Sequence, residues 1–363
     1  MPLLDQPNYS FDFAAHTQKF VEEYQKRRPD YEGYAGEIAN LLEKALRARK
    51  IPYATIEKRA KGIESFRKKV SKQSREDLAL PKYLNPLTDI EDLAGVRVIT
   101  YFLETIEEVD EVIYELFDVR EKLNKREKLE QTERFGYQSV HYIISFSQER
   151  LKFLELLNYA ELKAEIQVRT ILQHSWAEIE HDIQYTSVET IPATIRRRFA
   201  ALAGLLEIAD REFQAIQAED RQLKALARQS VLENKLEGLE ITPDAVKAYL
   251  DKLLGPDARV TDASYSFTAS MLHHLGFEDF HEIDVRIVEY TRINLDKDLS
   301  TIAWRAKQGQ IMKFETLLLA SMGRSFISKH PRATVNDFGE RYGKAVRRLR
   351  QAGIDVGKWE DSF

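Results

Sequence analysis

The pattern of apolar positions changes character along this 363-residue chain. Residues 12–50 place apolar side chains at helical spacings, and the pattern predicts helix broken at Pro29. Residues 51–190 carry short β-branched or alternating runs that predict strands, with helical stretches between them. The strands are expected at 54–59, 96–102, 119–125, 140–146 and 163–169. Strands interleaved with helices in this way indicate an α+β domain.

Helical periodicity dominates the rest of the chain. Thr105–Glu108 reads as a capping box that opens a helix. Further helices are predicted over 170–185, in a long segment after Pro192, and beyond residue 230 at 243–254, 262–275, 299–329 and 334–352. We therefore predict an N-terminal helical segment (1–50) packing on an α+β domain (51–230), followed by a mostly helical C-terminal domain (231–363).

Composition excludes several classes of protein. The chain has 54 Lys and Arg against 59 Asp and Glu, a net charge of −5, and no cysteine. The missing cysteines exclude disulfides, thiolate metal sites and a cysteine nucleophile. No apolar run reaches the length of a membrane span, and Met1–Gln6 lacks the basic start of a signal peptide. These features predict a cytoplasmic protein with no membrane contact.

Positive charge is concentrated in one stretch. Residues 50–75 hold nine basic and two acidic residues, although the whole chain is acidic. Arg59 and Lys61 are two apart and share one face of a predicted strand. Ser65 and Lys69 are four apart and share one face of a helix. Adjoining basic faces of this kind can cradle phosphates, whereas the alternative is an ordinary solvated basic surface.

Two acidic positions complement this basic stretch. Asp92 lies in Asp89–Arg97, just before an apolar strand. Glu165, Gln167 and Arg169 alternate with apolar residues and face one way. Mg²⁺ in phosphoryl transfer is commonly held by one or two carboxylates and substrate oxygens. The alternatives are a turn cap at Asp92 and a polar exterior at Glu165.

Two further clusters offer polar and aromatic groups. In Gly136–His141, Tyr137 presents a flat face for a base, and Gln138 and His141 supply polar atoms. On the next helix His174, Glu178 and His181 share one face at i, i+4 and i+7. Zinc is an alternative there, but the order is not that of metalloproteases. We expect support of a site or phosphate contact instead.

In this order, the motifs resemble the synthetase domain of the RelA/SpoT family, which makes the alarmones ppGpp and pppGpp. The resemblance covers about residues 40–210. The matching pieces are Arg59-x-Lys61-x-x-x-Ser65-x-x-x-Lys69, Asp92-Leu93-Ala94-Gly95-Val96-Arg97, Gly136-Tyr137-Gln138-Ser139-Val140-His141 and Glu165-Ile166-Gln167-Val168-Arg169-Thr170.

The resemblance implies a nucleotidyltransferase-like mixed β-sheet wrapped by helices. It also implies transfer of the β,γ-pyrophosphoryl group of ATP to a ribose 3′-hydroxyl, with AMP released. By the same resemblance, Arg59 would stack on adenine, Lys61, Ser65 and Lys69 would bind the ATP phosphates, and Arg97 would support them. Asp92 and Glu165 would hold Mg²⁺, and Glu165 would also activate the 3′-hydroxyl.

The acceptor side is also assigned by resemblance. Tyr137 would stack on the acceptor base, with Gln138, His141, Gln167, Arg169 and His174 around it. The sequence departs from the family before Tyr137, where the register of the basic residues 122–128 is not fixed, and Lys125 is our choice for the acceptor phosphate. The residues before Arg59 lack the His-Asp pair of the family's hydrolase domain, so we expect synthesis alone.

The acceptor has two candidates. GDP or GTP would give an alarmone, whereas toxic relatives modify the 3′ CCA end of tRNA. In fused toxin–antitoxin members of the CapRel type, a C-terminal domain restrains the toxin until a phage protein releases it. Residues 231–363 fit such a domain in size and place, although they lack the Tyr-x-x-Tyr plug of that type. A protein trigger that binds this domain is therefore a candidate partner, and the family resemblance adds homo-oligomers. A catalytically dead nucleotide-binding module is disfavoured because both Asp92 and Glu165 are present.

Overall fold

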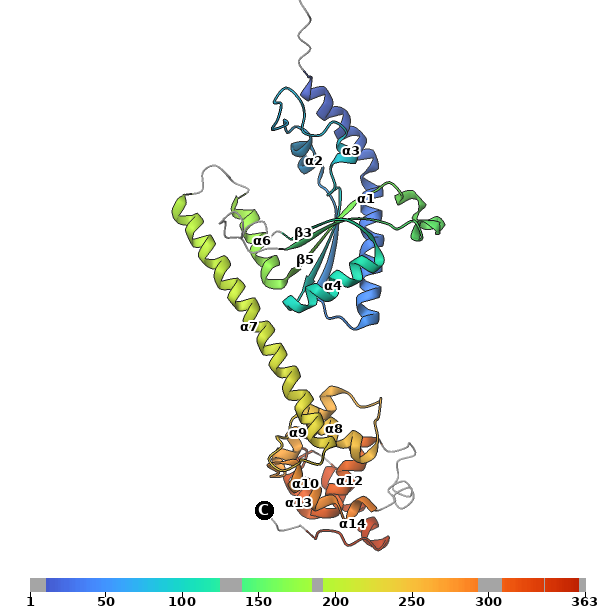
Figure 1. Ribbon diagram of the computed structural model, residues 1–363. Helices are drawn as coiled ribbons and strands as arrows, with labels where there is room; N and C mark the ends of the chain where they lie inside the picture. The colour runs from blue at the N-terminus through green and yellow to red at the C-terminus, as the bar shows by residue number, and fades with distance from the viewer. Residues whose placement is uncertain (1–10, 125–138, 185–191, 293–308, 336, 359–363) are drawn as a thin grey trace, which may run out of the picture. The chain divides into compact units, whose positions relative to one another are not determined.

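The computed structural model describes residues 11–124, 139–184, 192–292, 309–335 and 337–358. The chain divides into two compact units, residues 1–216 (unit 1) and 217–363 (unit 2), each with its own apolar core (Figure 1). The division falls within the long helix α7 (Ala193–Leu232). The boundary proposed from sequence, 230/231, lies further along the same helix.

A mixed five-stranded sheet forms the centre of unit 1, in the order β1-β2-β5-β4-β3. Strands β2 and β5 are parallel, and the other neighbouring pairs are antiparallel. The strands are β1 (Thr55–Ala60), β2 (Ala94–Thr100), β3 (Asp118–Asn124), β4 (Val140–Ser145) and β5 (Ala164–Thr170). The α+β fold predicted from sequence, with a mixed sheet among helices, is confirmed.

Alternation along the strands gives the sheet two unlike faces. Val96, Val98, Ile166 and Val168 are fully buried in the core of unit 1, whereas the residues between them are polar. Helix α1 (Phe13–Arg49) contributes Tyr24, Tyr34, Ile38 and Leu42 to that core. The remaining helical elements are α2 (Ile63–Val70), α3 (Pro86–Asp89), α4 (Leu103–Leu116), α6 (Ile171–Gln184) and the short turns η1 (Arg150–Lys152) and η2 (Leu154–Tyr159).

Helix α1 is continuous, so the break predicted at Pro29 is wrong. Proline inside a helix removes one hydrogen bond and costs about 3 kcal/mol. Val21 and Tyr24 are buried before Pro29, and Tyr31 and Tyr34 are buried after it. Because both halves pack on the same core, burial outweighs the cost of the proline.

The capping box predicted at Thr105 is also wrong. Helix α4 begins at Leu103, with Phe102 at the N-cap and no side-chain capping bond, and Thr105 is buried in the first turn. Thr100 Oγ1 donates to the Phe102 carbonyl oxygen over 3.1 Å, so the turn out of β2 sets the start of the helix.

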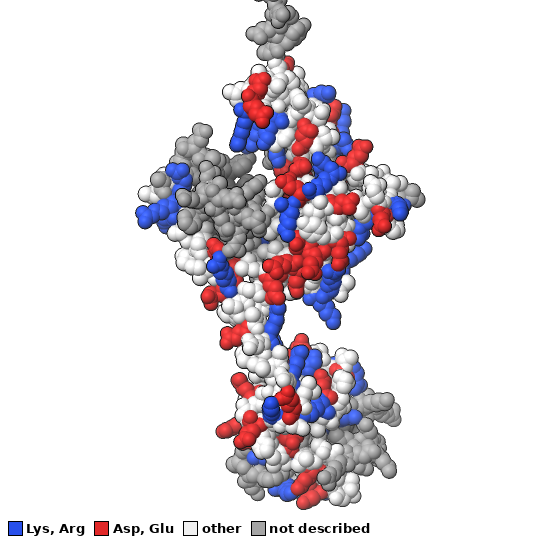
Figure 2. Space-filling model, in the orientation of Figure 1, with Lys and Arg blue, Asp and Glu red and all other residues white. Residues whose placement is uncertain are grey.

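Acidic side chains gather over α4 in Figure 2, which shows where part of the negative charge is concentrated.

Unit 2 is helical and packs around a core that includes Leu250, Leu272, Phe280, Phe314 and Phe326. Its elements are the last part of α7, α8 (Pro243–Leu254), α9 (Asp262–His274), α10 (Phe280–Ile287), η3 (Tyr290–Arg292), α12 (Gln310–Met322), α13 (Arg324–Lys329) and α14 (Phe338–Gln351). The expected helical C-terminal region is confirmed. Within the described residues, none of the helices has both the length and the apolar character needed to cross a membrane.

Candidate active site

The polar side of the sheet is assembled by strand register. Gly95 of β2 lies between Arg59 of β1 and Glu165 of β5, and Arg97 lies between Glu57 and Gln167. His141 of β4 pairs with Gln167. We call this surface the polar face, and it comprises Glu57, Arg59, Gly95, Arg97, His141, Glu165, Gln167 and Arg169. Most of the residues predicted from β1, β2, β4 and β5 therefore meet on one side of the sheet.

Asp92 sits at the entrance to β2 and joins the two predicted phosphate-binding lysines. Lys61 Nζ lies 2.7 Å from Asp92 Oδ2, and Lys69 Nζ lies 2.9 Å from Asp92 Oδ1. Burial alone would raise the pKa of Asp92, but the hydrogen bonds and charges of Lys61 and then Lys69 outweigh it and lower that pKa. Asp92 is thus held ionised between two cations.

Packing from α1 fixes this corner of the site. Tyr24 Oη donates to the Lys61 carbonyl oxygen over 2.7 Å, and the Tyr24 ring stacks on Phe66 of α2 at a centroid distance of 4.3 Å. The Lys61 backbone N–H donates to the Leu93 carbonyl oxygen over 2.9 Å. A buried tyrosine therefore ties the exit of β1, the helix α2 that carries Lys69, and the loop that carries Asp92 to one another.

Glu165 is held by two neighbours on the polar face. Its Oε1 lies 2.6 Å from His141 Nδ1, and its Oε2 accepts a hydrogen bond from Gln167 Nε2 over 2.7 Å. The other ring nitrogen of His141 lies 2.7 Å from Ser139 Oγ. The network is consistent when His141 donates from Nδ1 and accepts at Nε2 from the Ser139 hydroxyl, a tautomer assigned from these contacts.

Asp92 and Glu165 are both ionised, and their negative charges repel each other. Burial would raise the pKa of Glu165, but the bond and charge of His141, together with Gln167, lower it, while Asp92 opposes them. No group of three or more His, Asp or Glu that could hold a metal occurs among the described residues. Two ionised carboxylates fit a divalent cation whose remaining ligands are phosphate oxygens and water. Asp92 and Glu165 could therefore hold a divalent cation only if that cation also takes ligands from outside the chain.

Arg97 has two acidic partners: Glu57, which the sequence analysis did not assign to the site, and Glu178, which it grouped with His174. Its Nη1 lies 2.9 Å from Glu178 Oε1 on α6 and 3.4 Å from Glu57 Oε2 on β1. His174 Nε2 lies 3.8 Å from the other oxygen of Glu57, while His174 Nδ1 is buried without a hydrogen-bond partner. The sequence could have placed Glu57 on the polar face, because it stands two residues before Arg59 on β1 and residues two apart on a strand share a face.

Arg169 belongs to the polar face but is only 5% exposed. It donates to Gln167 Oε1, so Arg169, Gln167 and Glu165 form a chain of hydrogen bonds along β5. Burial, and then the positive charge of Arg97, lower the pKa of Arg169 to about 10. The predicted contact of Arg169 with an acceptor remains a prediction, because the observed contact is with Gln167.

The remaining predicted residues divide into two groups. Arg59 and Ser65 are exposed, and Arg59 lies over Gly95. A Cβ at Gly95 would meet Arg59 Cγ at 3.7 Å, an ordinary contact. Lys125, Tyr137 and Gln138 lie outside the described residues, and so does the side chain of His181.

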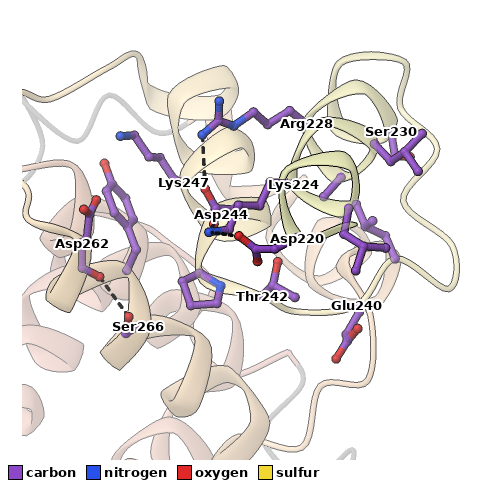
Figure 3. A pocket seen from close by; sticks show the side chains of 16 residues that line it. Asp220, Lys224, Arg228, Ser230, Glu240, Thr242, Asp244, Lys247, Asp262 and Ser266 are labelled. Atoms are coloured by element: carbon purple, nitrogen blue, oxygen red, sulfur yellow. Dashed lines mark hydrogen bonds and ion pairs between the residues drawn. The ribbon is translucent and has the colours of Figure 1, made fainter. Parts of the chain in front are cut away.

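A large cleft lies elsewhere. It has a volume of about 860 Å³ and lies in unit 2, between α7, α8 and α9 (Figure 3). None of the predicted synthetase residues lines it. Asp244 stands at its centre and pairs with Arg228 at 3.2 Å and Lys224 at 3.5 Å, while Lys224 also pairs with Asp220 at 2.9 Å.

Comparison with known proteins agrees with the motifs. Residues 58–190 match the family described as the region found in RelA/SpoT proteins. This stretch is a RelA/SpoT region. It contains the site residues from Arg59 to His174, so the resemblance predicted from the motifs is confirmed.

Named relatives of the RelA/SpoT region come from Bacillus subtilis strain 168. The chain is 24% identical to GTP pyrophosphokinase YjbM over 174 residues, which are 48% of this chain and 76% of YjbM. It is 31% identical to GTP pyrophosphokinase YwaC over 131 residues, 36% of this chain and 59% of YwaC. Both relatives support the predicted enzyme class, a pyrophosphokinase.

Solved structures were compared as well. The small alarmone synthetase 1 of Bacillus subtilis gives a TM-score of 0.45 at 21% identity, over 55% of this chain and 99% of that one. The small alarmone synthetase 2 of the same organism gives 0.45 at 24% identity, over 54% and 99%.

Proposed function

We propose that the chain transfers the β,γ-pyrophosphoryl group of ATP to the ribose 3′-hydroxyl of GDP or GTP and releases AMP. The observation that carries the proposal is that Asp92, paired with Lys61 and Lys69, acts electrostatically on Glu165. Arg97 lies on the same polar face as Glu165. Phosphoryl transfer depends mainly on positioning and on neutralising charge. The polar face offers cations for the phosphates and an ionised carboxylate for the hydroxyl.

Glu165 would act as the base. The 3′-oxygen attacks the β-phosphorus, the bond from that phosphorus to the α–β bridging oxygen breaks, and AMP leaves. The proton of the 3′-hydroxyl passes to Glu165 as the new bond forms. The depressed pKa keeps Glu165 ready to accept it at neutral pH, and His141 and Gln167 hold the carboxylate in place.

The phosphate-binding cations would change partners on binding ATP. Lys61 and Lys69 now neutralise Asp92, and Arg97 neutralises Glu57 and Glu178. Asp92 and Glu165 would hold Mg²⁺, which when bound supplies charge neutralisation at the phosphates. With that cation beside Asp92, both lysines can turn to the phosphate oxygens.

One experiment decides the acceptor. Purified full-length protein is incubated with ATP labelled at the γ-phosphate, and with GDP, GTP or bulk tRNA in parallel. Label in a guanosine product supports the proposal. Label on tRNA 3′ ends would replace it with the second candidate, a tRNA-modifying toxin in which unit 2 acts as the restraining domain.

Matched variants guard this test against contamination. Asp92→Asn keeps the shape of the side chain and should abolish transfer. Glu43→Gln removes a carboxylate from α1, away from the polar face, and should leave transfer unchanged. Glu43 Oε1 there lies 2.5 Å from Arg47 Nη2. No transfer to any acceptor by the unmodified chain, or equal transfer by Asp92→Asn, would refute the proposal.

A further inference from the structure

Asp210 of α7 is a buried acid that the proposed transfer does not use. It is only 2% exposed and lies outside residues 58–190, the stretch that matches the RelA/SpoT region. A carboxyl group loses its hydration when it is buried, so it needs partners that compensate for the loss. One partner is Thr170, whose Oγ1 donates to Asp210 Oδ2 over 2.7 Å. Thr170 is itself fully buried, at the point where β5 ends and α6 begins.

Thr170 caps helix α6. Its Oγ1 accepts a hydrogen bond from the Gln173 backbone N–H over 3.1 Å, and Gln173 Oε1 accepts one from the Thr170 backbone N–H over 2.9 Å. This reciprocal pair is a capping box, which satisfies donors that the start of a helix would otherwise leave unpaired. A hydroxyl has a single proton to donate. Because that proton goes to Asp210, the lone pairs of the Thr170 oxygen are left for Gln173, and Asp210 therefore orients the cap.

Helix α6 brings two side chains to the polar face. His174 and Glu178 are four residues apart and share one side of the helix. Glu178 Oε1 lies 2.9 Å from Arg97 Nη1, and His174 Nε2 lies 3.8 Å from Glu57 Oε1. The direction in which α6 leaves β5 therefore decides how Arg97 is paired.

Helix α7 is fixed on unit 1 by contacts on both sides of Asp210 along the chain. The ring of Phe199 packs edge-on against Trp176 of α6, with centroids 5.2 Å apart. Gln214 Oε1 accepts a hydrogen bond from the backbone N–H of Glu104 of α4 over 3.0 Å, and Gln214 Nε2 donates to Glu104 Oε2 over 2.9 Å. These contacts hold α7 where the Asp210 carboxyl meets the start of α6.

We propose that Asp210 is a positioning residue of the candidate active site. Through the Thr170 hydroxyl it fixes the start of α6, and so the place of Glu178 against Arg97. A capping box needs only its threonine and its glutamine. The added buried acid is explained if the cap must also be held in one orientation. The expected effect on transfer rests on the proposed function, whereas the expected effect on α6 does not.

The first test is hydrogen exchange of the full-length chain, followed in the α6 peptide 171–178. Asp210→Leu removes the acceptor, and Thr170→Val removes the hydroxyl. Each should make exchange in this peptide about tenfold faster, as expected when a helix loses its cap. The double variant should exchange no faster than Thr170→Val alone, because two residues that act through one bond are not additive. Asp210→Asn and Thr170→Ser keep an acceptor and a hydroxyl, and both should restore slow exchange.

The second test is the rate of label transfer from ATP to GDP or GTP. Asp210→Leu should lower kcat on the order of tenfold, because small displacements of positioned groups are costly to rate. Asp210→Asn should transfer at nearly the unmodified rate. The matched control is Glu212→Leu, which removes an exposed carboxylate from the same turn of α7 and should change neither exchange nor transfer.

The outcomes separate this proposal from the proposed function. Unchanged exchange in Asp210→Leu, additive effects in the double variant, or an equal loss in Glu212→Leu would overturn the role of Asp210. Faster exchange with unchanged transfer would reduce Asp210 to a stabilising contact and would also overturn it, while the proposed function would stand. If the unmodified chain transfers no label, the proposed function fails, and faster exchange still supports the hold of Asp210 on α6. Should Asp210→Leu not fold, the comparison of Thr170→Val with Thr170→Ser decides in the same way.

Discussion

The two units differ in what they bury. Unit 1 buries ionisable groups, namely His141, Arg169 and Asp210, each at most 5% exposed. Unit 2 buries the neutral side chains of Thr268, Gln310 and Ser321, together with His330. Burying a charge is costly unless partners compensate for it. Unit 1 therefore carries more of this cost than unit 2.

The reason for this difference lies in the architecture. A sheet whose one side fills the core leaves the opposite side for polar residues, and the polar face of unit 1 is bordered by α6, whose Glu178 reaches Arg97. The helices of unit 2 direct their apolar sides to a shared core and their charges outward, as α14 does. Clustered, compensated charge in the interior is typical of catalytic sites, whereas outward charge is typical of binding surfaces.

The largest effect is expected at Glu165. Glu165→Gln keeps the size of the side chain but removes the base and one metal ligand, so kcat should fall by about 1000-fold. The rate of label transfer from ATP, with both substrates saturating, measures this fall in kcat. The control is the melting temperature, which should change little because Gln can still accept from His141. A fall of less than tenfold would mean that another group takes the proton.

The second prediction concerns His330, which is buried in unit 2. Burial, and then Arg332, lower the pKa of His330 to about 4 from 6.5. The folded state therefore favours neutral His330, and this stability is complete above pH 6.5 and is lost as the pH falls toward 4. Between pH 7 and pH 5 unit 2 should lose about 2 kcal/mol of unfolding free energy.

Hydrogen exchange of α13 and α14 peptides measures this loss locally. His330 stacks on Phe338 and packs against Phe326, so His330→Phe should remain folded and should lose the pH dependence. An unchanged pH dependence in that variant would assign the acid sensitivity to other groups.

These contrasts bear on what the sequence could predict. The β-branched runs predicted every strand of the sheet, because strands buried on one side must alternate. The same alternation placed Glu165, Gln167 and Arg169 together. The pairing of Arg97 with Glu57 and Glu178 could not be predicted, since it joins β1, β2 and α6 through tertiary packing. The continuity of α1 through Pro29 depends likewise on burial of Tyr24 and Tyr31, which local propensity does not contain.

The third prediction tests how unit 1 compensates its buried charge. His141 is a positioning residue that lowers the pKa of Glu165, against the burial that would raise it. His141→Leu removes that support, so the pKa of Glu165 should rise and the acid limb of kcat/KM should move to higher pH. Activity at pH 8 should fall about tenfold, with a larger loss at pH 6. A uniform loss at all pH values would indicate a merely structural role for His141.

The smallest effect is expected from the exposed charges of unit 2. Asp244, in the first turn of α8, pairs with Arg228 and Lys224 of α7, whose side chains are 57% and 45% exposed (Figure 3). Solvent screens such pairs, so Asp244→Asn should cost at most about 1 kcal/mol, and the cost should shrink in high salt. Hydrogen exchange of α7 peptides 217–232 at two salt concentrations measures it. A loss several times larger and independent of salt would show that unit 2 depends on compensated charge as unit 1 does, and the contrast between the units would fail.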